Sequence, residues 1–277
     1  LVRWLYWIVT VGVTAAELYA CSLYLQFWAP DLPQWAGVAI LGAIVVAINV
    51  VSVKSFGTIE FWLSSIKVIA VVVFILVGLC LVFFGLPGTP AAGVSNWTND
   101  GGFMPFGFKG VWVSMALVMF SFGGIEMLSI SAAEAKDPAR SIRTAAQSTV
   151  IRLSFFYVVA IGIIVALVPW KEASGAAGDV RLSPFVMVFH ELGIPAAAGL
   201  TNLIVVITAL SAANANVYAG SRFLHSLAAD SLAPQMLERT TTRGIPLPGI
   251  IVHACGILVV VVLAMTCLLY TSDAADE

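Results

Sequence analysis

Three ionisable side chains lie inside long apolar runs of the sequence, where a charge is costly to bury. Glu17, Lys67 and Glu126 each have mostly apolar residues on both sides. An ionisable group within a membrane span is rare and marks a substrate, ion or proton pathway by default. These three residues are therefore the first candidates for ligand binding and proton transfer.

Each candidate also has a structural interpretation. The Lys67 side chain could extend its ammonium to the membrane interface. Glu17 and Glu126 could instead form structural hydrogen bonds between helices. Asn214 and Asn216, which lie in another apolar run, are typical of interhelical hydrogen-bonding residues.

Two adjacent glycines interrupt the run that contains Glu126. The segment reads Phe120-Ser-Phe-Gly-Gly-Ile-Glu126, and paired glycines weaken a helix so that its backbone can unwind. An unwound segment exposes N–H groups that suit a carboxylate and C=O groups that suit an ammonium. The pattern favours an amino-acid zwitterion as ligand, although close packing of helices against the glycines explains it equally well.

The elements that must position these residues are helices that cross a membrane. A helix needs about 20 apolar residues to cross the hydrocarbon core. Seven runs are predicted to do so, over residues 4–27, 35–53, 61–84, 111–133, 151–168, 196–218 and 250–266. Residues 184–192 form a shorter apolar segment that we interpret as a surface helix or lid. The predicted fold class is an all-α, polytopic membrane protein.

Basic residues are distributed unevenly between the two sides of these spans. If the spans alternate in direction, the positive-inside rule places the richer side in the cytoplasm. That side carries Arg3, Lys54, Lys136, Arg140, Arg143, Arg152, Arg222, Arg239 and Arg243, and the other carries Lys109, Lys171 and Arg181.

Composition argues against a soluble enzyme or a nucleic-acid-binding protein. Hydrophobic residues make up 60% of the chain and charged residues 10%, whereas about a quarter of residues in soluble proteins are charged. The sequence contains no phosphate-binding GxxxxGK[ST] pattern, no HExxH pattern and no basic strip. We expect no cofactor, no metal and no nucleic-acid partner.

Several stretches, in the same order along the chain, resemble bacterial amino acid permeases of the amino acid–polyamine–organocation superfamily. They cover residues 14–35, 48–70, 120–170, 183–199 and 211–234. The resemblance implies a fold of two inverted five-helix repeats. It also implies that the seven spans correspond to the third to ninth helices of such a permease, without helices one, two and ten to twelve.

Substrate in such permeases lies near the membrane midplane, between the broken first and sixth helices. The run with the paired glycines matches the sixth helix. The resemblance therefore implies that Phe120 is an aromatic gate, and that Ser121, Phe122, Gly123 and Gly124 form the unwound backbone at the substrate.

The resemblance also assigns roles to the remaining candidates. Lys67 matches a fifth-helix lysine that takes the place of a sodium ion in proton-coupled relatives, and Glu126 matches an acidic residue just beyond the break. Both are expected to act in proton coupling. Glu17 and Asn214 would border the substrate pocket from the third and eighth helices.

The expected function is secondary active transport of L-amino acids across the bacterial inner membrane, by proton symport with alternating access. An amino acid/polyamine exchanger and a non-transporting amino-acid sensor remain alternatives. The expected partners are an amino acid substrate, protons and the lipid bilayer. Residues 1–266 would form the membrane domain, whereas residues 267–277 resemble a translated sequencing adaptor and are expected to be non-native.

Overall fold

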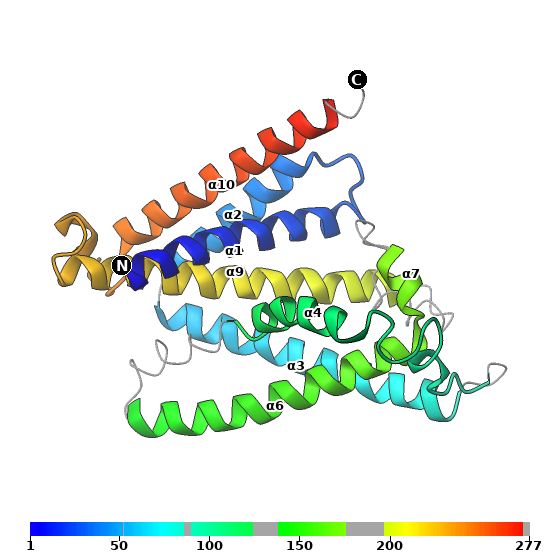
Figure 1. Ribbon diagram of the computed structural model, residues 1–277. Helices are drawn as coiled ribbons and strands as arrows, with labels where there is room; N and C mark the ends of the chain where they lie inside the picture. Colours follow the sequence, from blue (N-terminus) through cyan, green and yellow to red (C-terminus); the bar gives the residue numbers. More distant parts are fainter. Residues whose placement is uncertain (52, 86–89, 124–137, 176–196, 274–277) are drawn as a thin grey trace. The chain divides into compact units, whose positions relative to one another are not determined.

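The computed structural model describes all residues except 52, 86–89, 124–137, 176–196 and 274–277 (Figure 1). Its described part is helical and contains no strand. The chain divides into two compact units, one formed by Leu1–Lys67 and Gly199–Glu277 and the other by Val68–Ala198.

The first unit is built from apolar helices of both ends of the chain. They are α1 (Val2–Leu25), α2 (Gln34–Val51), the first part of α3 (Val53–Phe83), α9 (Ala197–Ala229) and α10 (Leu247–Asp273), with the short 3-10 helix η3 (Gln235–Glu238) between the last two. The helices α1, α2 and α10 pack against one another (Figure 1). The core that they share with α9 includes Leu18, Val45, Val217 and Ile257.

Prolines and local hydrogen bonds set the helix ends in this unit. Pro33 directly precedes α2, and Pro248 occupies the first turn of α10, where its missing N–H costs nothing. The turn between α1 and α2 is closed by Gln26, whose Nε2 donates to the Leu32 carbonyl oxygen at 3.1 Å. A short turn therefore joins α1 to α2.

Basic residues of this unit gather where α1 begins and where α2 and α9 end. Arg3 forms an ion pair with Asp230 at 2.6 Å and donates to the Ser226 hydroxyl at 2.8 Å. Arg243 donates to the Val51 carbonyl oxygen at 3.2 Å. These contacts agree with the prediction that Arg3 and Arg243 lie on the same side of the membrane.

The second unit consists of the rest of α3 with η1 (Ser95–Trp97), α4 (Gly107–Ser121), α6 (Pro138–Leu167) and α7 (Trp170–Gly175). Phe74, Ile75 and Ile163 form its core. The loop before α4 is held to α6 because Asn96 donates to the Ala166 carbonyl oxygen at 2.9 Å. Trp97 likewise donates to the Gly162 carbonyl oxygen at 3.0 Å.

Five helices of the described part are long and apolar enough to cross a membrane: Val2–Leu25, Gln34–Val51, Glu60–Phe83, Thr149–Leu167 and Gly199–Ala229. Shorter apolar helices at Gly107–Met119 and Leu247–Leu263 match the other two predicted spans. The remainder of the predicted span 111–133 and the predicted short helix 184–192 include residues outside the described part. The helix α10 continues beyond residue 266 to Asp273.

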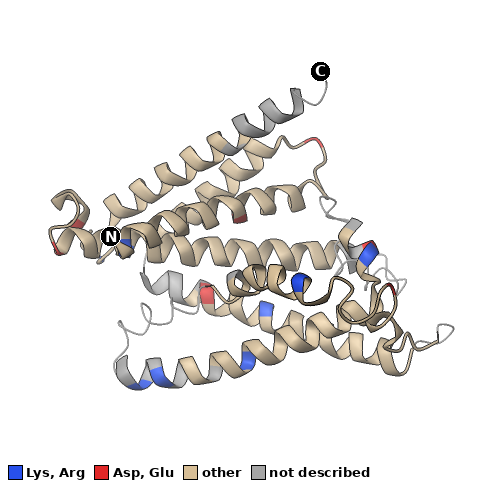
Figure 2. Ribbon diagram, viewed as in Figure 1, with Lys and Arg blue, Asp and Glu red and all other residues tan. Residues whose placement is uncertain are grey.

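Charged residues are few along these helices (Figure 2), and many large apolar side chains are exposed on them. Leu76 on α3 is 59% exposed and Val158 on α6 is 72% exposed. A protein in water would not leave so many large apolar side chains open, but lipid is as apolar as they are. The chain is therefore a multi-pass, all-α protein of the cell membrane.

Gly249 allows α10 to approach the backbone of α9. A Cβ atom at this position would lie 2.7 Å from the Ser221 carbonyl oxygen, which cannot rotate away. We expect Gly249→Ala to lower the free energy of unfolding by about 1–3 kcal/mol, measured as a lower melting temperature in detergent. Gly42→Ala is the control, because its added Cβ would make an ordinary contact with Leu18 at 3.6 Å. Equal melting temperatures for the two variants would contradict the prediction.

Candidate functional site

The helix α9 carries three neighbouring polar side chains that each bond to a different helix. The pairs are Ser211 with Glu60 on α3 at 2.6 Å, Asn214 with Asn49 on α2 at 2.8 Å, and Asn216 with Glu17 on α1 at 3.2 Å. All belong to the first unit. Polar contacts of this kind contribute, together with close packing, to the association of helices inside a membrane.

Lys67 forms an ion pair with Glu60. The Lys67 Nζ atom lies 3.6 Å from Glu60 Oε1, and the two side chains are 25% and 23% exposed. Both residues are on α3, seven positions apart, which is close to two helical turns and places them on one face. The Lys67 ammonium therefore meets the carboxylate of a residue two turns nearer the start of α3.

Glu60 was not among the residues predicted from the sequence. It lies immediately before the predicted run 61–84 and therefore outside the spans in which ionisable residues were sought. The spacing of seven residues to Lys67 was the available signal, because residues two turns apart on a helix share a face.

Glu17 is half-buried on α1, and its carboxylate accepts a hydrogen bond from the Asn216 amide. This is the contact that the structural interpretation of Glu17 requires. The carboxylate is also close enough to Lys67 for the two charges to interact. The first unit thus brings together two of the ionisable residues singled out in the sequence.

Asn214 is 1% exposed, and its Oδ1 atom accepts a hydrogen bond from Asn49 Nδ2. Its own Nδ2 atom has no hydrogen-bond partner among the described residues. An unpaired buried amide N–H is costly. The geometry places Asn214 between helices, with both N–H groups of its amide left for a further partner.

The remaining candidates belong to the second unit, at the end of α4. This helix ends at Ser121, directly before the predicted break, and Gly123 lies in a turn. The Phe122 ring meets the Tyr157 ring edge to face at 5.2 Å between centroids. Phe120 lies in the last turn of α4, while Gly124 and Glu126 are outside the described residues.

Tyr157 on α6 supports this helix end, and the sequence did not reveal it. Its hydroxyl donates to the Ser121 carbonyl oxygen at 2.7 Å. The last carbonyl groups of a helix have no intrahelical partner, so Tyr157 satisfies one of them where α4 stops. The end of α4 before the paired glycines agrees with the predicted interruption of this helix.

Comparison with known proteins assigns the chain to a family. The family model described as amino acid permease matches residues 1–273. Over 251 residues, or 91% of the chain, the sequence is 43% identical to the aromatic amino acid transport protein AroP of Escherichia coli strain K12 and to AroP of Salmonella typhimurium strain LT2. Over 264 residues, or 95% of the chain, it is 39% identical to the uncharacterized amino acid permease YtnA of Bacillus subtilis strain 168.

These alignments cover 54% of the AroP proteins and 56% of YtnA. The chain therefore spans about half the length of the curated relatives it matches. The match nevertheless extends over nearly all of this chain, and the resemblance described from the sequence is confirmed. On its helical architecture, its family match and its relatives, this chain belongs to the amino acid permease family.

Proposed function

We propose that the full-length permease containing this chain carries out secondary active transport of L-amino acids by proton symport with alternating access. The observation that carries this proposal is the Lys67 ammonium, held among apolar helices of an amino acid permease with Glu60 and Glu17 as its acidic neighbours. Burying a charge inside a membrane span costs free energy, and a functional role explains such a charge best.

Lys67 would supply a positive charge that is lost when its ammonium releases one proton. When Lys67 is protonated, the ammonium balances nearby carboxylates. When it releases the proton toward the other side, that balance is lost and a different arrangement of helices is favoured. A ligand or proton shifts a conformational equilibrium only through such a difference between the two states.

The broken end of α4 would provide the substrate contacts. The carbonyl groups at this C-terminal helix end, near Ser121 and Gly123, suit the ammonium of an amino acid. Phe120, Phe122, Gly124, Glu17 and Asn214 are proposed as substrate-binding residues, and Glu126 and Lys67 as residues of proton coupling.

We propose aromatic amino acids as the substrate class, because AroP, a relative 43% identical to this chain, is named an aromatic amino acid transport protein.

The proposal predicts that proteoliposomes containing the full-length permease accumulate phenylalanine when their interior is made alkaline. A protonophore should abolish the accumulation, and a sodium gradient should not replace the pH gradient. Liposomes without protein are the control. Uptake that requires trapped amino acid or polyamine, without a pH gradient, would identify an exchanger. Binding without any flux would identify a sensor.

A further inference from the structure

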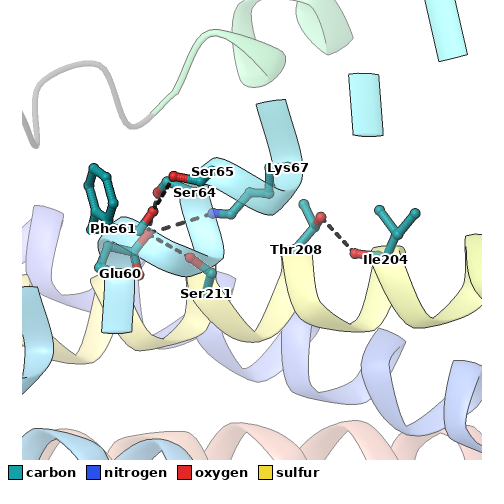
Figure 3. A network of polar contacts seen from close by, with 8 residues as sticks. All are labelled: Glu60, Phe61, Ser64, Ser65, Lys67, Ile204, Thr208 and Ser211. Carbon is teal, nitrogen blue, oxygen red and sulfur yellow. Dashed lines mark hydrogen bonds and ion pairs between the residues drawn. The ribbon is translucent and has the colours of Figure 1, made fainter. Parts of the chain in front are cut away.

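The Glu60 carboxylate is the centre of a small polar network between α3 and α9 (Figure 3). Its Oε1 atom accepts hydrogen bonds from the Ser211 hydroxyl at 2.6 Å and from the Ser64 hydroxyl at 3.1 Å, and it lies 3.6 Å from the Lys67 ammonium. Its Oε2 atom is buried and has no hydrogen-bond partner among the described residues.

The two charges of this network depend on each other. A carboxylate with one oxygen unpaired and buried is poorly solvated, so it needs a nearby cation to remain charged. The Lys67 ammonium needs an anion for the same reason. Removing either partner leaves an uncompensated charge, which is the costly change in a buried ion pair.

The same carboxylate joins the ion pair to a second helix. Ser211 on α9 is fully buried and donates to Glu60 across the interface with α3. Thr208, one turn earlier on α9, donates instead to the Ile204 carbonyl oxygen of its own helix (Figure 3). Of these two hydroxyl groups, the Ser211 hydroxyl is the one that connects α9 to the charged pair.

We propose that Glu60 is a positioning residue for the Lys67 ammonium, and that its bond to Ser211 ties the charge state of Lys67 to the contact between α3 and α9. The inference rests on the proposed role of Lys67 in proton coupling. Deprotonation of Lys67 leaves Glu60 without its counter-ion, and the Glu60–Ser211 contact then has to rearrange. Glu17 on α1 is a second acidic group that acts on Lys67, so the test includes it unchanged in every variant.

The test compares Glu60→Gln, Glu60→Asp and Ser211→Ala in the full-length permease reconstituted in liposomes. We expect Glu60→Gln to reduce accumulation driven by a pH gradient by about tenfold or more, because one partner of a buried charge pair is lost. Exchange of labelled for unlabelled substrate, which needs no net proton movement, should fall much less. Glu60→Asp should restore part of the driven accumulation, and Ser211→Ala should lie between Glu60→Gln and the unaltered protein.

Thr208→Val is the matched control, because it removes a hydroxyl from the same helix without touching Glu60. Its driven accumulation and exchange should equal those of the unaltered protein. The proposal is overturned if Glu60→Gln accumulates substrate normally, or if it loses exchange and driven accumulation to the same extent.

A double-mutant cycle of melting temperatures in detergent tests the pairing of Glu60 with Lys67 independently of transport. Glu60→Gln and Lys67→Met should each lower the melting temperature, and the double variant should melt above at least one of them, since neither charge of the Glu60–Lys67 pair is left without the other. Additive losses would overturn the pairing. If the unaltered protein shows no driven accumulation, the proposed transport function fails while the cycle still decides the role of Glu60.

Discussion

Replacing Lys67 by alanine in the full-length permease is expected to reduce pH-driven accumulation of substrate to the level of liposomes without protein. Among the described residues, the Lys67 ammonium is the only cationic group of the Glu60 network, and its loss leaves the Glu60 and Glu17 carboxylates without this positive charge. Because the proposed coupling depends on a charge that Lys67 gains and loses, no residual coupling should remain. The measurement is radiolabelled uptake with an alkaline interior, at matched amounts of reconstituted protein.

Lys171→Ala is the matched control for this substitution. Lys171 also forms an ion pair, with Asp100 at 2.7 Å, but its side chain is 59% exposed. Exposed ion pairs contribute about 0–1 kcal/mol, so Lys171→Ala should transport as the unaltered protein does. Concentrative uptake by Lys67→Ala across a pH gradient would refute the proposed role of Lys67.

The membrane spans were predictable because their signal is local. An apolar run long enough to cross the bilayer has to form a helix, since each backbone polar group must be satisfied within the segment. The predicted run 35–53 and the helix Gln34–Val51 differ by only one residue at the start. The end of α4 at Ser121 was also predictable, because adjacent glycines weaken a helix wherever they occur.

The partners of the buried polar residues were not predictable in the same way. Hydropathy gives the depth of Asn214 in the membrane but not the rotation of its helix or the identity of its neighbours. The contact with Asn49 depends on how α2 and α9 pack, over a separation of 165 residues. Glu60 and Tyr157 were missed for a related reason, because their roles come from side chains that meet across helices.

Glu17→Gln is expected to lower substrate uptake by about tenfold or more while leaving the protein as stable as before, since each 1.4 kcal/mol of lost interaction is worth tenfold. A glutamine side chain has nearly the same shape and can still accept the hydrogen bond that Asn216 donates to Glu17. It lacks the negative charge that acts on Lys67. The substitution thus separates the two interpretations of Glu17 that the sequence left open.

Asn216→Ala supplies the complementary control, because it removes the hydrogen bond and keeps the Glu17 charge. Interhelical hydrogen bonds in membranes contribute about 0.6–2 kcal/mol, so this variant should melt at a lower temperature. Its uptake per folded molecule should remain above that of Glu17→Gln. The opposite outcome is that Glu17→Gln transports normally, while Asn216→Ala and Glu17→Ala lose stability. Glu17 is then a structural link between α1 and α9. In that case Glu60 alone supplies the negative charge that Lys67 needs for proton coupling.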